Sequence, residues 1–321
     1  MNPIIPVHIL FDDPHWEERI AQGMAQYGYT PRFLHGEVRE DDLRDAEILY
    51  GDFPTQFLPQ CKNLRWLQCS FAGVDRYAHR ELYVNPDTVV TNAAGSFGIT
   101  ISEHMICVLL MMMRRMPEYR ELVARREWRN LGRIRSIYGS TVCVIGMGDI
   151  GSNFAKRVRA MGARVIGVRR SEDKPAPDWA DAVFPTARLE EALAQADVTA
   201  LCVPSTRETR HLMGEEQFAA MKDGAYLLNV GRGTAIDQEA LDRALRAGKL
   251  AGAAIDVADP EPLPQDHFLW ETPNLILTPH VSGNMSLPKT CDIVVDIFLN
   301  NLAKWSRGEP LDHVVDLDRG Y

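Results

Sequence analysis

The sequence predicts an α/β fold built on parallel sheets. Three observations support this prediction. Strand and helix patterns alternate along most of the chain, a Gly-x-Gly-x-x-Gly turn joins one strand to the next helix, and several later strands end in polar residues. Such alternation is typical of parallel sheets covered by helices, in which ligands bind beyond the carboxyl ends of the strands. The length of 321 residues suggests about two domains.

Composition and charge are those of an ordinary globular protein, with 45% hydrophobic residues, 25% charged residues and a net charge of −9. No basic patch with interleaved aromatic residues is present, which argues against a nucleic-acid partner. The arginine-rich stretch 114–135 is interrupted by glutamates and is interpreted as a solvated or subunit-facing helix. No apolar run reaches about 18 residues, and no basic segment with an apolar core opens the chain. We therefore expect no membrane span, no signal peptide and a cytoplasmic protein.

Six cysteines stand at scattered positions without a Cys-x-x-Cys pair. We therefore expect no disulfide framework and no zinc or other metal site. Cys107, Cys143 and Cys202 lie in apolar runs and are expected to be small core residues.

Residues 1–92 alternate between strand and helix patterns. Helices are predicted at 15–27 and 42–45, and strands at 7–11, 29–34, 48–50, 64–69 and 89–91. The turn Ser-Phe-Ala-Gly-Val-Asp at 70–75 follows one of these strands. Its small residues would let backbone N–H groups approach a carboxylate, and an ordinary tight turn explains the same residues equally well.

A long helix is predicted over residues 99–128. The side chains on or near one stripe of it are His104, Val108, Met111, Met112 and Arg115. The methionines are interpreted as core or interface residues rather than as part of a cofactor site. From its length and its arginine-rich continuation, we expect this helix to join two domains and to contact a second subunit.

Residues 141–171 predict a strand, a turn, a helix and a second strand. Gly146 permits the tight turn, Gly148 lets a pyrophosphate approach the backbone, and Gly151 lets helix and strand pack closely. The N-terminus of the helix offers N–H groups and the positive end of its dipole to phosphates. The whole unit therefore predicts dinucleotide binding, whereas a glycine triplet alone would be explained as well by packing.

The alternation continues to the last predicted strand, at 275–277. Helices are predicted at 189–196, 215–220 and 238–247, and strands at 199–203, 225–230 and 253–257. Successive strands thus end in functional residues at the edge where a doubly wound sheet binds ligands.

Three residues beyond strand ends form a candidate catalytic set. Arg232, between two glycines, can hold a planar carboxylate through two parallel hydrogen bonds. His280 can give or take a proton near neutral pH, and a carboxylate such as Glu261 would favour the imidazolium and orient the ring. Each residue taken singly has an alternative interpretation: a surface ion pair for Arg232, a solvated glutamate for Glu261 and a structural histidine for His280. Together they fit the reduction of a 2-keto acid by a nicotinamide.

Seven ordered blocks resemble those of the D-isomer-specific 2-hydroxyacid dehydrogenase family, over nearly the whole chain. They are SFAGVD, GSFGITISEH, VIGMGDIG, CVPSTRETRHLM, NVGRG, AIDVADPEP and TPHVSG, and GEPL follows near the C-terminus. The resemblance implies two Rossmann-like, doubly wound parallel-sheet domains with an interdomain cleft. The substrate domain would be discontinuous, 1–95 with 287–321, and 96–286 would bind the dinucleotide. It also implies a homodimer joined through the cofactor domains and the long helix.

The resemblance also assigns roles to residues. It implies that Arg232 binds the substrate carboxylate and carbonyl, that Glu261 is the partner of the histidine, and that His280 is the general acid/base. The expected substrate contacts are Ala72, Gly73, Val74, Arg232 and His280. The expected cofactor contacts are Gly146, Gly148, Asp149, Ile150, Gly151, Arg169, Arg170, Ser171, Val203, Pro204, Thr209, Val230, Gly231, Arg232, Asp256, His280, Ser282 and Gly283.

The sequence departs from the NAD-using members of that family at two places. Their ribose-binding aspartate is replaced by Arg169, followed by Arg170 and Ser171. Arginine cannot accept a bond from the ribose hydroxyl but can pair with the 2′-phosphate of NADP. We therefore predict a preference for NADP(H), with NAD(H) as a weaker alternative, and solvated arginines are the other interpretation. Asp149 inside the glycine turn does not favour phosphate binding unless its carboxylate points away.

The leading functional interpretation is an NADP(H)-dependent D-2-hydroxyacid dehydrogenase or 2-keto acid reductase, resembling glyoxylate/hydroxypyruvate reductases. It would transfer a hydride between the nicotinamide and C2 of a small 2-keto or 2-hydroxy acid. The alternative is a dinucleotide-sensing, corepressor-like binding protein without significant turnover. A formate dehydrogenase is disfavoured because that branch lacks the glutamate found here as Glu261. A phosphite dehydrogenase shares all three catalytic residues, so these residues do not separate it from the leading interpretation.

Overall fold

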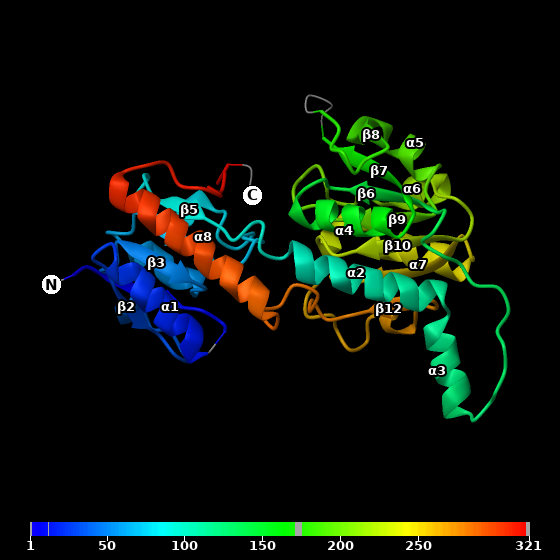
Figure 1. Ribbon diagram of the computed structural model, residues 1–321, viewed down its shortest axis with the longest axis horizontal. Helices are drawn as coiled ribbons and strands as arrows, with labels where there is room; N and C mark the ends of the chain where they lie inside the picture. Colours follow the sequence, from blue (N-terminus) through cyan, green and yellow to red (C-terminus); the bar gives the residue numbers. More distant parts are fainter. Residues whose placement is uncertain (1, 12, 171–174, 319–321) are drawn as a thin grey trace. The chain divides into compact units, whose positions relative to one another are not determined.

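The structure is a computed structural model that describes residues 2–11, 13–170 and 175–318. The chain divides into two compact units (Figure 1). The first unit consists of Met1–Phe97 together with Met285–Tyr321, and the second unit is Gly98–Asn284. Each unit is built on one parallel sheet flanked by helices, so the predicted α/β class with two parallel sheets is confirmed. The sequence-based division placed the junctions at 95/96 and 286/287.

The sheet of the first unit has the order β2-β1-β3-β4-β5, and all its described pairs are parallel. Its strands are short and mostly buried, as their apolar runs predict. They are β1 (Ile4–His8), β2 (Thr30–Phe33), β3 (Ile48–Gly51), β4 (Trp66–Gln68) and β5 (Val89–Thr91). Short 3₁₀ turns at Glu40–Asp42, Thr55–Gln60 and Arg80–Leu82 connect them.

Two helices from opposite ends of the chain pack side by side on this sheet, α1 (Pro14–Ala25) and α8 (Pro288–Arg307) (Figure 1). Phe298 of α8 stacks on Tyr50 of β3 with ring centroids 3.8 Å apart. The fully buried Asn301 donates to Gln68 Oε1 at 3.0 Å. Burial of these side chains joins the C-terminal segment to the first unit and makes that unit discontinuous in sequence.

The sheet of the second unit has the order β12-β11-β10-β9-β6-β7-β8, and all its described pairs are parallel. The chain runs outward from β6 to β8 and then returns to β9 on the other side of β6. The carboxyl ends of β6 and β9 are therefore a topological switch point, where such sheets bind ligands. The strands are β6 (Thr141–Ile145), β7 (Arg164–Arg169), β8 (Ala182–Pro185), β9 (Val198–Leu201), β10 (Ala225–Asn229), β11 (Leu250–Ile255) and β12 (Leu275–Leu277).

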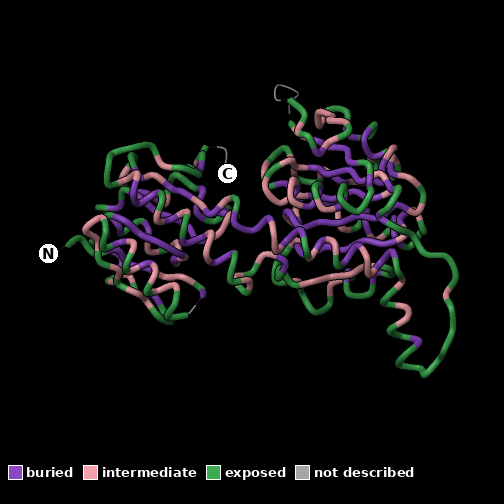
Figure 2. The backbone as a smooth tube through the Cα atoms, viewed as in Figure 1, coloured by how far each residue is buried: buried purple, intermediate pink, exposed green. Residues whose placement is uncertain are grey.

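Helices cover this second sheet. In the described residues, α2 packs on α4, and α6 packs on both α5 and α7. The helices are α2 (Gly98–Met113), α3 (Met116–Ala124), α4 (Asp149–Ala160), α5 (Leu189–Leu193), α6 (Glu215–Ala220) and α7 (Gln238–Arg246). Figure 2 shows the buried strands enclosed by partly exposed helices. None of the described helices has the length and apolar character needed to cross a membrane.

The single helix predicted over 99–128 is wrong, because the chain forms two helices there. The first ends at Met113, Arg115 adopts a left-handed conformation with φ of 59°, and α3 begins at Met116. The physical reason is Pro117, which has no N–H for the carbonyl four residues earlier and whose ring would clash with it. The segment after α3 is extended and exposed, so residues 116–135 form a projecting arm (Figure 2).

The expectation for the cysteines is correct in part. Cys143 is fully buried in β6, and burial raises the pKa of its thiol to about 12. Cys202 is partly exposed, and burial raises the pKa of its thiol to about 12 as well. Cys107 is exposed, contrary to the expectation, because it lies on the face of α2 opposite the buried stripe of Met105, Val108 and Leu109. All six cysteines are free thiols.

Candidate active site

Arg232, Glu261 and His280 lie beyond the carboxyl ends of three adjacent parallel strands, β10, β11 and β12. Because the strands are parallel, the three residues emerge at the same edge of the sheet. The structure therefore brings these sequence-predicted residues to one side of the second unit.

His280 and Glu261 are in direct contact. The Nδ1 atom of the ring lies 2.8 Å from Oε2 of the carboxylate, and both side chains are exposed. The other carboxylate oxygen accepts the N–H of Ala258 at 2.9 Å, which holds Glu261 from the opposite side. A carboxylate accepts hydrogen bonds, so Nδ1 donates and Nε2 is the nitrogen available for proton exchange with a ligand.

Arg232 lies half-buried in a tight turn after β10, and its Nη1 donates to Gly231 O at 2.8 Å. The turn packs against the loop that carries Glu261. A Cβ atom at Gly233 would lie 2.0 Å from the carbonyl of Ala258, so only glycine fits at this approach. The arginine turn and the glutamate loop are thus in van der Waals contact through Gly233 and Ala258.

The glycine turn after β6 lies at the topological switch point. Gly146 has φ of +96°, and a Cβ atom at Gly151 would lie 2.0 Å from the carbonyl of Gly146. A Cβ atom at Gly148, by contrast, would meet open space. Gly148 is the N-cap of α4 and has no side chain to bond the first N–H groups of the helix. The turn therefore fits a pyrophosphate, which would approach Gly148 and bind these N–H groups.

The side chain of Asp149 turns away from the open space at Gly148. Its Oδ1 accepts Asn153 Nδ2 at 2.9 Å and would lie 2.5 Å from a Cβ atom at Gly98, the first residue of α2. The carboxylate therefore packs between the N-termini of α4 and α2, where two helix dipoles favour negative charge. This placement removes the sequence-based objection to phosphate binding at the turn.

Arg169 ends β7, and Arg170 follows as an exposed residue, while Ser171 lies outside the described residues. Arg169 Nη1 donates to Pro175 O at 3.4 Å. Glu208 lies in the loop after β9, and the pKa of its carboxyl is lowered. The causes are hydrogen bonds from the backbone N–H of Glu208 and from the Thr206 hydroxyl, followed by the charges of Arg170 and Arg207. Arg170 and Arg207 therefore lie near enough to Glu208 for their charges to act on its carboxylate.

The remaining expected cofactor contacts surround this same edge of the second sheet. Thr209 closes the loop after β9, because its hydroxyl donates to Pro204 O at 2.7 Å and accepts the N–H of Thr206 at 2.8 Å. The others follow the ends of β6, β9, β10 and β12, and they are Ile150, Val203, Val230, Gly231, Ser282 and Gly283.

The structure adds Asn229 and Thr278, which motif reasoning did not single out, and shows the contacts of Asp256. Asn229, at the end of β10, is fully buried and hydrogen-bonds the arginine turn. Thr278 donates to Asp256 at 2.5 Å. Asp256 itself is 2% exposed, and its carboxylate bonds the turn that carries His280. Of these three residues, only Asp256 was among the predicted site residues. The sequence signal that could have indicated Asn229 and Thr278 was their position close to Arg232 and His280.

The loop 70–75 belongs to the first unit and follows β4. The carbonyls of Phe71, Ala72 and Val74 accept hydrogen bonds from Ala93, Asn92 and Tyr77. Among the described residues, the N–H groups of Ala72, Gly73 and Val74 donate no hydrogen bond. These N–H groups are suitable donors for an anion, and the expected contact with a substrate carboxylate stays a prediction.

Comparison with known proteins places this architecture in a family. A family model described as the D-isomer specific 2-hydroxyacid dehydrogenase, NAD binding domain, matches residues 106–282, more than half of the chain. A glyoxylate reductase from Korarchaeum cryptofilum is 33% identical over 230 residues, which cover 68% of this chain and 67% of that protein.

Solved structures agree with this match over the whole chain. A D-isomer specific 2-hydroxyacid dehydrogenase family protein from Aeromonas salmonicida has 35% identity and a TM-score of 0.86, with 99% of each chain covered. An NADPH-dependent glyoxylate/hydroxypyruvate reductase from Sinorhizobium meliloti, in complex with NADP and sulfate, has 26% identity and a TM-score of 0.84, with 100% of each chain covered. The chain belongs to the D-isomer-specific 2-hydroxyacid dehydrogenase family, whose members are NAD(P)-dependent oxidoreductases that act on the CH–OH group of small hydroxy acids.

Proposed function

We propose that this protein is an NADP(H)-dependent D-2-hydroxyacid dehydrogenase that works as a reductase of small 2-keto acids. The observation that carries the proposal is the 2.8 Å contact between His280 and Glu261 beside the Arg232 turn. This arrangement provides an acid/base and a carboxylate binder at one sheet edge. A bound nicotinamide supplies the hydride that C2 of the keto acid accepts.

Each of the three side chains has a separate task in this proposal. Arg232 binds the substrate carboxylate through a planar pair of hydrogen bonds and thereby orients the carbonyl. His280 donates the proton that neutralises the developing alkoxide, and positioned acid–base catalysis of this kind typically contributes roughly 10²- to 10⁴-fold. Glu261 keeps Nδ1 bonded, so that Nε2 carries the exchanged proton.

The substrate class is a small, unbranched 2-keto acid such as glyoxylate or hydroxypyruvate. The relatives from Korarchaeum cryptofilum and Sinorhizobium meliloti, whose names state these reactions, support this choice. A steady-state panel of glyoxylate, hydroxypyruvate, pyruvate and branched 2-keto acids, with NADPH and with NADH, tests it. Tight NADPH binding without turnover on the whole panel would favour the sensor alternative, and turnover of phosphite alone would favour a phosphite dehydrogenase.

The proposed cofactor preference rests on Arg169 and Arg170 at the end of β7. The charge of Arg170 already acts on a neighbouring anion, the carboxylate of Glu208, and a 2′-phosphate at the end of β7 would pair with the same guanidinium. We expect kcat/KM for NADPH to exceed that for NADH by at least about tenfold, because a charge-assisted contact contributes roughly 1.5–3 kcal/mol. The Arg170→Ser variant is expected to lose most of this ratio, with kcat/KM for NADH little changed.

The matched control for that variant lies on β7, the strand that Arg170 follows. Arg164 begins β7 at the opposite edge of the sheet, where its Nη1 contacts Gln195 Oε1 at 3.3 Å. Arg164→Ser should leave the cofactor ratio as it is in the wild type. Equal catalytic efficiency of the wild-type protein with NADPH and NADH would refute the preference.

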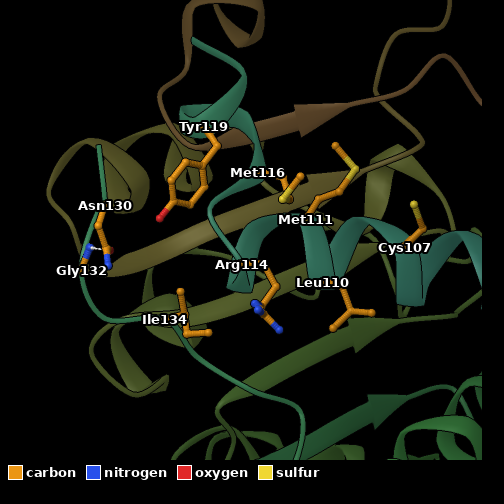
Figure 3. A pocket seen from close by; sticks show the side chains of 9 residues that line it. All are labelled: Cys107, Leu110, Met111, Arg114, Met116, Tyr119, Asn130, Gly132 and Ile134. Atoms are coloured by element: carbon orange, nitrogen blue, oxygen red, sulfur yellow. Dashed lines mark hydrogen bonds between the residues drawn. The ribbon is translucent and has the colours of Figure 1, made fainter. Parts of the chain in front are cut away.

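A homodimer formed through the second unit is the remaining part of the proposal. The arm is held to α2, because Arg135 N–H donates to Met113 O at 3.1 Å. Within the arm, Tyr119 OH accepts Leu131 N–H at 3.2 Å. Several of its apolar side chains are nevertheless exposed, namely those of Met116, Val123 and Ile134, and Trp128 is fully exposed. An open groove of about 630 Å³ lies between α2 and the arm (Figure 3). Exposed apolar surface of this kind is typical of a subunit interface.

The dimer has a direct test in solution. Light scattering coupled to gel filtration should give twice the chain mass of 36.1 kDa for the wild type. Trp128→Glu should give the monomer mass, because the carboxylate would be desolvated in the interface. Val84→Glu, which changes an exposed apolar residue of the first unit, is the control and should stay dimeric. A monomeric wild type would contradict the proposal.

A further inference from the structure

The loop that carries Glu261 is largely exposed and has few hydrogen bonds of its own. It runs from Val257, after β11, to Leu263, whose side chain packs on the core of the second unit. Within the loop, Ala258 N–H donates to Glu261 Oε1 at 2.9 Å. That bond joins two residues of the same loop, so it orients the carboxylate within the loop but does not tie the loop to the rest of the unit.

The side chain of Gln238 supplies a tie from outside the loop. Its Oε1 accepts Asp259 N–H at 3.0 Å, and its Nε2 donates to Asp259 O at 2.6 Å. The amide thus bonds both backbone groups of a residue that lies two positions before Glu261. Among the described residues, no other hydrogen bond from outside reaches the backbone of 257–263. Arg210 lies 3.9 Å from the Asp259 carboxylate, and an exposed ion pair of this kind contributes little.

Gln238 is itself held at a rigid position. It is the first residue of α7, and Asp237 caps this helix by accepting Ala240 N–H at 3.0 Å. Asp237 N–H also donates to Met213 O at 2.9 Å, which ties the start of α7 to the segment after β9. The apolar side chains of α7 belong to the core of the second unit. A side chain at this fixed helix end can therefore hold an exposed loop in place.

The amide is the chemistry that this contact needs. Glutamine offers an acceptor and a donor on one uncharged group, and the Asp259 backbone presents the complementary pair. A carboxylate at 238 would set an oxygen against Asp259 O, and an apolar side chain would leave both backbone groups without this partner. The contact matters for the site because Glu261 bonds His280 Nδ1 at 2.8 Å, so a shift of the loop moves the carboxylate away from the ring.

We propose that Gln238 is a positioning residue of the reaction, which acts on His280 through Glu261. Its two bonds to Asp259 keep the loop where the carboxylate meets the histidine ring. This inference rests on the proposed function, in which His280 transfers the proton to the substrate.

The kinetic test uses Gln238→Met, which keeps nearly the same side-chain length and removes both hydrogen bonds. We expect kcat for glyoxylate to fall by roughly tenfold, because a displacement of about 1 Å near a catalytic group can cost up to roughly 100-fold. KM for glyoxylate and the dissociation constant of NADPH should change less than about threefold, since the variant leaves Arg232 and the glycine turn as they are.

Gln217→Met is the matched control. Gln217 lies in the first turn of α6, is also half-buried, and accepts Gly214 N–H at 3.1 Å while donating to Glu190 Oε1 at 2.9 Å. It therefore loses the same kinds of bond at another helix start, away from the glutamate loop. Both variants should lose some thermal stability, and only Gln238→Met should lose turnover.

A double-mutant cycle shows whether the effect runs through the glutamate. In the background of Glu261→Ala, Gln238→Met should lower kcat by less than about twofold, because no carboxylate is left to position. A loss of roughly tenfold in both backgrounds would mean that the two residues act independently, and it would overturn the proposal.

Hydrogen exchange followed by mass spectrometry gives a readout that does not depend on turnover. Asp259 N–H loses its acceptor in Gln238→Met, so a peptide spanning 257–263 should exchange faster than in the wild type and in Gln217→Met. Gln238→Ala removes the same two bonds and serves if the first variant fails to fold. Unchanged exchange in this peptide would overturn the proposal whatever the value of kcat.

The measurements also separate the positioning role from the proposed function. Faster exchange at 257–263, with a loss of kcat that depends on Glu261 and leaves KM unchanged, supports the role. A fall in kcat with an equal rise in KM would indicate a merely structural role and overturn it. A wild-type protein without turnover would overturn the proposed function and the catalytic role together, and the exchange result would then decide only whether Gln238 anchors the loop.

Discussion

Replacing His280 with alanine is expected to lower kcat by roughly 100- to 10,000-fold, the range typical of a lost general acid. The reason is geometric, because Glu261 bonds Nδ1 at 2.8 Å and leaves Nε2 as the nitrogen that exchanges the proton in the proposed reaction. The dissociation constant of NADPH should change less than about threefold, since the proposed role of the histidine is proton transfer to the substrate oxygen. Steady-state reduction of glyoxylate and fluorescence titration with NADPH measure the two quantities.

Two further variants make the result specific. Glu261→Gln keeps the size of the side chain but replaces its charge, so kcat should fall less than in His280→Ala. His79→Ala changes an exposed histidine of the first unit, 3.9 Å from Glu81, and should behave as the wild type. Wild-type kcat in His280→Ala would remove the proton-transfer role from this residue.

Replacing Arg232 with lysine is expected to raise KM for the keto acid by roughly 10- to 100-fold. Lysine keeps the positive charge but lacks the planar pair of donors, and each lost hydrogen bond to a charged group costs roughly 1.5–3 kcal/mol. The turn itself should survive, because Asn229 bonds the backbone of Gly231 and Arg232 rather than the guanidinium. The measurement is KM and kcat for glyoxylate at saturating NADPH.

The control for this change is Arg243→Lys. Arg243 is an exposed arginine on α7 that lies 3.7 Å from Glu215 and 3.8 Å from Glu239. Exposed ion pairs of this kind contribute little, so the variant should have normal kinetics and stability. Normal KM in Arg232→Lys would place the carboxylate site elsewhere on the chain.

Local patterns predicted much of the fold. The run 142–145 is β6, and the glycine turn and the helix after it lie where the sequence places them. These elements are predictable because their cause is local: apolar side chains in a short run bury a strand, and glycine permits the turn. The longest helix, α8, was not predicted, although Pro288 and Gly308 mark its two ends. Its burial depends on α1 and β3, which are remote in sequence.

The division of residues 99–128 into two helices shows the limit of periodicity. The apolar pattern continues through the break, and the stripe alone predicts one helix. Pro117 was the local signal for a boundary, because proline disfavours the helical conformation of the residue before it. The exposure of Cys107 has a similar origin, because an apolar neighbourhood in sequence does not tell which side of a helix meets the core.

For the site, sequence motifs indicated Arg232, Glu261 and His280 one by one, and the structure shows that the last two are in contact. Motifs also placed Asp256 among the cofactor contacts, without showing that its carboxylate bonds Val281 and Ser282. Those bonds join residues 25 and 26 positions apart, and no spacing rule links them.

By itself, the sequence determined the α/β class, the dinucleotide turn and the identity of the catalytic candidates, because each depends on residue type and short-range spacing. Only the tertiary structure decided that Asp149 turns toward α2, that Asn229 and Asp256 hydrogen-bond the turns that carry Arg232 and His280, and that the arm projects from α2. These features depend on which backbone N–H and carbonyl groups meet across strands, and that is set by the packing of the whole sheet.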